Sequence, residues 1–260
     1  LEQIHESEKT LDPDYTQDFF NIISRIPRLI QFYYKEPQGS TLSAVSRFNI
    51  ITACSEMLKN ATGSLETLHL VIEKSQYLNS LLNSLTALSP DFLQLKAVTL
   101  SICEYSAKDC TKKVILKYLE SLRNVKSLKE VAFLLDGVLD IDFSRKMIEN
   151  FVRCRSLISL EIFSLSVNRE SLKEIMRDLV GLGQLEKLLL WFNAAGREGE
   201  IGFEGEKTEL FERIGKTVGA LENLRNVCLM FGLPGFGERD IQDLRRKLKQ
   251  ENMKLSVKIY

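Results

Sequence analysis

The sequence contains few of the residues on which catalytic and metal sites depend. It has only two histidines, His5 and His69, and a single tryptophan among 260 residues. A Ser–His–Asp or Cys–His arrangement would have to use His69, because His5 lies in a polar segment at the start of the chain. No second pair of cysteines completes a zinc-like spacing with Cys103 and Cys110. We therefore expect no catalytic residues, no metal and no cofactor.

Other scarcities exclude further classes of protein. Five cysteines, an odd number, do not suggest a disulfide framework, which favours a reducing, intracellular and cytoplasmic location. Lys and Arg number 35 and Asp and Glu number 35, so there is no basic excess of the kind that marks a general nucleic-acid binder. No apolar run approaches the roughly 18–20 residues that span a bilayer. We expect no membrane span and no small-molecule substrate.

What the sequence does contain is a repeat, best seen in Leu185–Asn193, which is spelled LEKLLLWFN. In each unit a leucine is followed by apolar residues three and five places later. The first leucines of the seven units are Leu29, Leu65, Leu95, Leu128, Leu157, Leu185 and Leu224. All three columns are apolar in every unit, so the pattern runs through nearly the whole chain.

The two spacings within a unit predict its secondary structure. Apolar residues two apart predict a short strand with one buried face, here Leu188 and Leu190. Apolar residues three apart before the first leucine, such as Leu179 and Leu182, predict the inner stripe of a helix. One unit cannot bury its apolar face alone, so we expect stacked units with a continuous core.

The pattern L-x-x-L-x-L resembles the leucine-rich repeat family. Spacings of 36, 30, 33, 29, 28 and 39 residues, with a true helix in each unit, are similar to the ribonuclease-inhibitor-like type. The family usually has Asn or Cys at the ninth place. Here only Cys103 and Asn193 fit, and residues such as Asp136 and Leu165 make the chain divergent. The resemblance implies an α/β leucine-rich-repeat solenoid, a horseshoe with parallel strands on the concave side and helices on the convex side.

The repeat also predicts the domain organisation. We expect residues 1–260 to form a single leucine-rich-repeat domain. Residues 1–13 are polar and should be a loose tail, and 14–25 should form a helix that caps the N-terminal end of the core. Residues 26–260 should hold seven to eight repeats, ending in the alternating strand Leu255–Tyr260.

Two segments contain residue types found in calcium and phosphate sites, but the spacing of these residues does not fit either kind of site. Asp136, Asp140 and Asp142 lack the D-x-D-x-D-G order and the late Glu of a calcium loop, so we expect a solvated loop. Gly196–Thr208 ends in G-E-K-T, but Glu206 separates the glycine from the lysine that a phosphate loop needs. Its four glutamates would also repel phosphate, so we expect a flexible insertion.

The concave face carries the most informative pattern. Strand alternation places the seventh residue of each unit on this face. From the fourth unit on, the column becomes apolar, and with strands ~4.8 Å apart it would span roughly 15 Å. An exposed row rich in Trp, Phe and Met indicates an interface. We predict that the partner-binding residues are Leu134, Phe163, Leu189, Trp191 and Met230. Alternatively, residues 193–207 fold over the row, with Ile201 and Phe203 covering it.

Together these patterns predict a non-enzymatic protein–protein interaction module or scaffold. Its partner would be a protein, within a multi-subunit complex, bound to the concave face. The alternative is a regulatory protein acting on an enzyme, because Ran-type GTPase activators and substrate-recognition subunits of ubiquitin ligases have similar repeats. An enzyme that uses His69 is a third and less favoured hypothesis.

Overall fold

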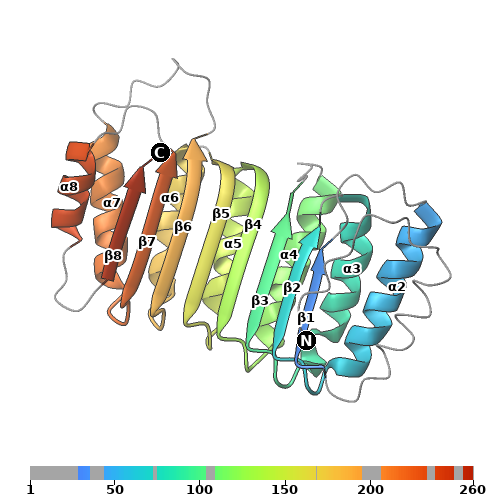
Figure 1. The fold of residues 1–260 in the computed structure, drawn as a ribbon. Helices are drawn as coiled ribbons and strands as arrows, with labels where there is room; N and C mark the ends of the chain where they lie inside the picture. The colour runs from blue at the N-terminus through green and yellow to red at the C-terminus, as the bar shows by residue number, and fades with distance from the viewer. Residues whose placement is uncertain are drawn as a thin grey trace.

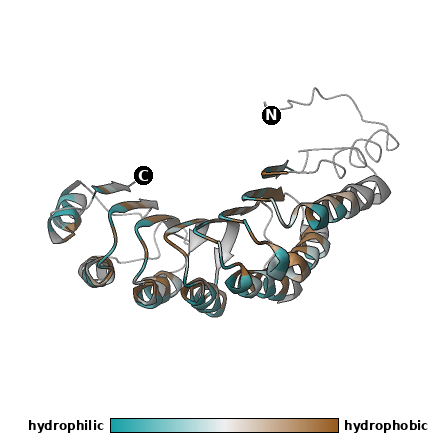
Figure 2. Cartoon of the chain, turned by 90° about the horizontal axis from the view of Figure 1, so that it is seen from below, coloured by the Kyte–Doolittle hydropathy of each residue, from teal (hydrophilic) through white to brown (hydrophobic). Residues whose placement is uncertain are grey.

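The chain forms one open sheet of eight parallel strands that follow one another in chain order. The computed structural model describes residues 29–35, 44–72, 75–103, 109–167, 169–194, 206–232, 238–248 and 254–259. Its helices all cover one side of the sheet, and the sheet curves so that its other side is concave (Figures 1 and 2). The predicted α/β solenoid is confirmed. The predicted tail 1–13 and capping helix 14–25 lie outside the described residues.

Strands and helices alternate along the described residues, and three of the described helices are followed by a short 3₁₀ turn. The strands are β1 (Gln31–Lys35), β2 (Thr67–Ile72), β3 (Ala97–Ile102), β4 (Glu130–Leu139), β5 (Ser159–Val167), β6 (Lys187–Ala194), β7 (Asn226–Gly232) and β8 (Lys254–Ile259). The helices are α2 (Ala44–Ala61), α3 (Ser75–Leu88), α4 (Asp109–Ser121), α5 (Ile141–Arg153), α6 (Arg169–Asp178), α7 (Glu206–Ala220) and α8 (Glu238–Lys247). The 3₁₀ turns are η1 (Ser89–Asp91), η2 (Leu122–Asn124) and η3 (Leu179–Gly181).

In four repeats, those of Leu128, Leu157, Leu185 and Leu224, the first leucine closes the turn before the strand through a backbone hydrogen bond. The sequence places Leu185 at the start of a strand, whereas β6 begins two residues later, at Lys187. The Leu185 N–H donates to the Leu182 carbonyl at 2.9 Å, and Leu157 and Cys154 repeat this bond at 3.0 Å. The leucine is buried because it lies at the turn between helix and strand. Apolar character alone cannot distinguish that position from the strand itself.

The core lies between the sheet and the helices. Leu160, Leu188 and Leu190 point toward the helices and are fully buried, as the repeat pattern predicts. Polar groups also link neighbouring repeats inside this layer. The hydroxyls of Ser89 and Ser121 lie 2.7 Å apart and are buried. Satisfied bonds of this kind avoid the cost of burying a polar group without a partner.

The acidic segment 136–142 does not form the loop that the sequence analysis expects. β4 continues through Asp136 to Leu139, with a register shift between Leu135 and Val138, and α5 begins two residues after the strand ends. Val138 pairs with Ser166 of β5, so ladder pairing extends the strand past the ninth place. Among the described residues, no group of His, Cys, Asp or Glu side chains is placed to hold a metal ion.

Asp140 instead caps the helix. Its carboxylate accepts a hydrogen bond from the Phe143 N–H at 2.8 Å and is ion-paired with Lys112 of the preceding repeat. Burial alone would raise the pKa of Asp140. The hydrogen bonds from Lys112 and Phe143, with the charge of Lys112, outweigh burial and hold that pKa below its ordinary value.

Replacing Asp140 with Ala should lower the free energy of unfolding by about 1 kcal/mol, the usual value of an N-cap. Because the folded-state pKa is lowered, this contribution is present above the ordinary value of 3.8 and is lost as pH falls through the lower folded-state value. Urea unfolding of both proteins between pH 7 and pH 3 would measure it. Asp142→Ala, at an exposed neighbouring acid, should cost only a few tenths of a kcal/mol. Equal losses for the two variants, or a difference independent of pH, would contradict the capping role.

Candidate partner-binding surface

The seventh-place side chains of four consecutive repeats stand in one row across β4 to β7. Leu134 pairs with Phe163, Phe163 with Trp191, and Trp191 with Met230 in the strand register. We call these four residues the apolar ladder. They lie on the face opposite the helices, because their strand neighbours such as Leu190 point into the core.

Side chains in the apolar ladder cover one another in part. The rings of Phe163 and Trp191 meet edge to face, with centroids 5.7 Å apart and planes at 64°. All four residues, and Leu189 beside them, are half-buried rather than fully exposed as the alternation alone suggests. The reason is that neighbouring strands of a parallel sheet bring large side chains into lateral contact. Each of the four side chains keeps some exposed area, and each is the register neighbour of the next.

Polar residues bound the ladder at both ends. On the N-terminal side the row continues through Ser101, Val71 and Lys35 of β3, β2 and β1. On the C-terminal side, Met230 is followed by Lys258 of β8. In the strand register the apolar ladder therefore spans β4 to β7, between Ser101 of β3 and Lys258 of β8.

The neighbouring row holds an ion pair that the sequence analysis missed. Leu189 stands in the fifth-place row between Glu161 of β5 and Cys228 of β7. Glu161 forms an ion pair with Lys187. Lys187 lies on β6, two residues before Leu189. Both charges lie on the concave face, so this ion pair adjoins Leu189 on the side away from β7.

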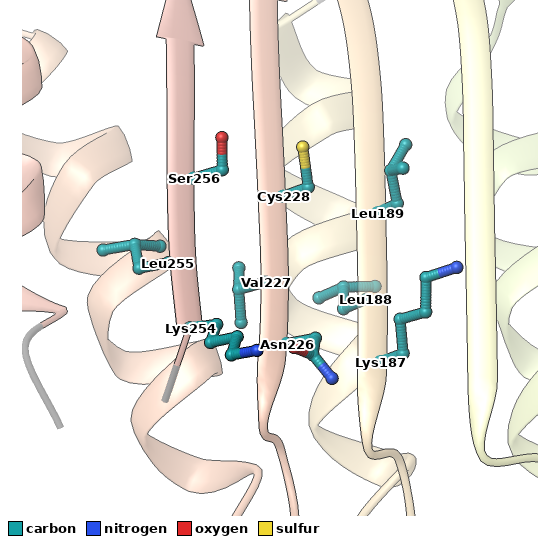
Figure 3. Close-up of a pocket in the computed structure, with 9 residues that line it drawn as sticks. All are labelled: Lys187, Leu188, Leu189, Asn226, Val227, Cys228, Lys254, Leu255 and Ser256. Carbon is teal, nitrogen blue, oxygen red and sulfur yellow. The ribbon is translucent and has the colours of Figure 1, made fainter. Parts of the chain in front are cut away.

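A shallow hollow lies beside the apolar ladder, toward the amino ends of β6, β7 and β8 (Figure 3). Its volume is about 260 Å³. The third-place residues Lys187, Asn226 and Lys254 line one side of the hollow, and the fifth-place residues Leu189, Cys228 and Ser256 line the other. Leu188, Val227 and Leu255 lie between these two rows and complete the lining. The third place is polar in most repeats, and only Lys187 and Lys254 make it basic, so the sequence carries no clear signal for this hollow.

The structure offers no support for a catalytic His69. Its ring packs against Tyr33 of β1, with centroids 4.6 Å apart, and burial lowers its pKa. Two candidate nucleophiles on the neighbouring repeat, Ser101 and Cys103, have their Oγ and Sγ atoms 4.0 Å apart. In the part of the chain that the structure describes, neither is hydrogen-bonded to His69. The ring packing explains the position of His69 without catalysis.

Two further expectations concern the segment 193–207 and a membrane span. Most of the segment 193–207, which folds over the ladder in the alternative hypothesis, lies outside the described residues, since 195–205 are not described. Within the described ranges, none of the helices is both long and apolar enough to cross a lipid bilayer.

Comparison with known proteins gives weak structural likenesses. No protein-family model and no curated protein sequence matches the chain. The tropomodulin C-terminal domain of Caenorhabditis elegans is 16% identical, with a TM-score of 0.43, over 64% of this chain and 90% of that one. An internalin from Listeria monocytogenes is 12% identical, with a TM-score of 0.30, over 99% of this chain and 86% of that one. With one parallel strand and one helix in each repeat, the chain has a leucine-rich-repeat-like solenoid fold.

Proposed function

We propose that this chain is a non-enzymatic interaction module, a divergent leucine-rich-repeat protein of the ribonuclease-inhibitor-like type. It binds a polypeptide partner on its concave face, as a subunit of a larger assembly in the cytoplasm. The observation that carries the proposal is the apolar ladder: Leu134, Phe163, Trp191 and Met230 in one register across four strands. Free thiols at Cys54, Cys103, Cys154 and Cys228 agree with a reducing compartment.

The composition and placement of the ladder favour a protein partner. Trp, Phe and Met are enriched at the centres of protein interfaces, where charged residues are depleted. The row is continuous rather than scattered, so a single partner segment could cover it. The concave side of a solenoid is also a rigid, extended surface, because each repeat is held by its neighbours. A partner that displaces water from this row would gain binding energy from the remaining exposed apolar area.

An affinity purification from cells that express the chain would test the proposal. Trp191→Asp and Leu189→Asp place a charge on the concave surface, and both should lose the partner that the wild type retains. Val180→Asp is the matched control, because Val180 is 44% exposed but lies in η3, outside the strands. All variants must retain the melting temperature of the wild type within a few degrees.

The result would also separate the two functional hypotheses. A partner that is an enzyme, with a turnover rate that changes on adding the chain, would favour a regulatory protein. A partner without activity, held in a stable complex, would favour a scaffold subunit. Retention of every partner by both concave variants would contradict binding at the ladder.

A further inference from the structure

We propose that the hollow beside the apolar ladder binds a carboxylate side chain of the polypeptide partner, with Lys254 and Asn226 as the hydrogen-bond donors. This inference rests on the proposed function and adds the chemistry of the partner. It predicts a segment with an acidic residue at a fixed distance from its apolar residues.

The hollow has the size and position for one side chain of a partner. Its volume of about 260 Å³ leaves room for an Asp or Glu side chain together with some of its hydration. It lies on the same concave face as Trp191 and Met230 and is lined by the same strands, β6 and β7, together with β8. A partner segment that contacts Trp191 or Met230 and runs along β6 and β7 would therefore also reach the hollow.

Of the two lysines that line the hollow, Lys187 forms an ion pair, whereas Lys254 forms none with a described residue. Lys187 is neutralised by Glu161, and its side chain extends toward β5, away from the centre of the hollow (Figure 3). The Lys254 side chain instead reaches toward Asn226 on β7 (Figure 3). Lys254 forms no ion pair with any described residue, and no side-chain hydrogen bond of Asn226 is found in the described ranges. Among the residues that the structure describes, the hollow thus presents one lysine without a counter-charge and one amide donor.

An acidic group suits this arrangement better than other partner groups. An ammonium has three donors and no acceptor, so it needs an acceptor when a partner displaces its water. A carboxylate satisfies both Lys254 and the Asn226 amide, and such charge-assisted bonds are roughly twice as strong as neutral ones. A basic partner side chain would be repelled, and an apolar one would leave Lys254 desolvated without a counter-charge.

The register fixes where the acid should lie in the partner. Asn226 and Met230 are the third and seventh residues of one repeat, four residues apart on β7. Four residues of strand span about 13 Å. An extended partner segment that runs along the strands should therefore carry its Asp or Glu about four residues from the apolar residue on Met230 or Trp191.

Selection of peptides would test this inference directly. A phage library of random peptides would be selected on the folded wild-type chain, and the best peptide would be synthesised with its Glu or Asp and with Gln or Asn in that position. Affinities would be measured by fluorescence anisotropy for wild type, Lys254→Gln and Asn226→Ala. Lys216→Gln, at an exposed lysine of α7 on the helical side, is the matched control. Trp191→Asp would be measured with the same peptides.

We expect the selected peptides to pair apolar residues with an acid about four residues away. Replacing the acid of the peptide with Gln or Asn should weaken its binding to the wild-type chain and to Lys216→Gln about tenfold. The same replacement should weaken binding to Lys254→Gln less than about twofold. Asn226→Ala should weaken binding of the acidic peptide and is a second test of the proposed donors.

Other outcomes would overturn the inference. Peptides that need Trp191 but show no acidic preference would overturn it while leaving the proposed function intact. So would equal losses on neutralising the acid in wild type and Lys254→Gln. If inorganic phosphate alone raises the melting temperature of wild type but not of Lys254→Gln, and no acidic peptide is selected, the hollow binds small anions instead. Failure to select any peptide that depends on Trp191 would count against both proposals.

Discussion

Replacing Leu190 with alanine should lower the free energy of unfolding by about 2–5 kcal/mol, the range for a buried leucine. The Leu190 side chain is fully buried on the helical side of β6, between Ile162 of β5 and Leu229 of β7 in the register. Truncation removes its transfer free energy and leaves a cavity between repeats that the helices can fill only in part.

Urea or thermal unfolding followed by circular dichroism would measure the loss. Leu93→Ala is the control, because Leu93 is 67% exposed and should cost less than about 0.5 kcal/mol. Since each repeat contacts mainly its neighbours, the Leu190 variant should also broaden the transition or unfold adjacent repeats first. A loss under about 1 kcal/mol for Leu190→Ala would mean that the side chain does not occupy the core.

Replacing Trp191 with alanine should weaken partner binding by about 2–4 kcal/mol, which is roughly 30- to 1,000-fold in Kd. Trp191 lies near the middle of the ladder, flanked by Phe163 and Met230 in the register. Its edge-to-face contact with Phe163 holds the indole in place before binding, so less conformational entropy is lost when the partner arrives.

The control for Trp191 lies in the same row of the sheet. Val71 of β2 is a half-buried residue at the seventh place, but Ser101 separates it from the apolar run. Val71→Ala should change Kd less than about threefold. Isothermal titration with the purified partner would measure both variants. Equal effects of the two substitutions would mean that binding energy is spread along the row and does not concentrate at Trp191.

The repeat pattern was sufficient to predict the solenoid, because burial on one face imposes a period that the sequence must keep. Leu188 and Leu190 are buried because they alternate on β6, and the same period holds in every unit. Strand ends were less predictable. Leu185 belongs to a turn closed by a backbone hydrogen bond to Leu182. Such a bond does not depend on the side chains, so the pattern of apolar residues does not reveal it.

In the candidate site, too, some features could be predicted from the sequence and others could not. Register and alternation place Phe163 beside Trp191, and both spacings can be counted in the sequence. The half-burial of these side chains depends on ring packing across strands, which no single strand encodes. The ion pair of Glu161 with Lys187 joins different columns of neighbouring repeats, so a search along single columns cannot find it.

The measurement that tests the central claim most directly is a binding titration of the Phe163→Ala, Trp191→Ala double variant. The partner would be the protein retained by the wild-type chain, and the variant must first show a cooperative unfolding transition like that of the wild type. Removing both rings deletes the centre of the apolar ladder but leaves Leu160, Leu188 and Leu190 in the core. We predict no detectable binding at partner concentrations that saturate the wild type. An unchanged Kd for this folded double variant would contradict the claim that the concave ladder is the partner-binding surface.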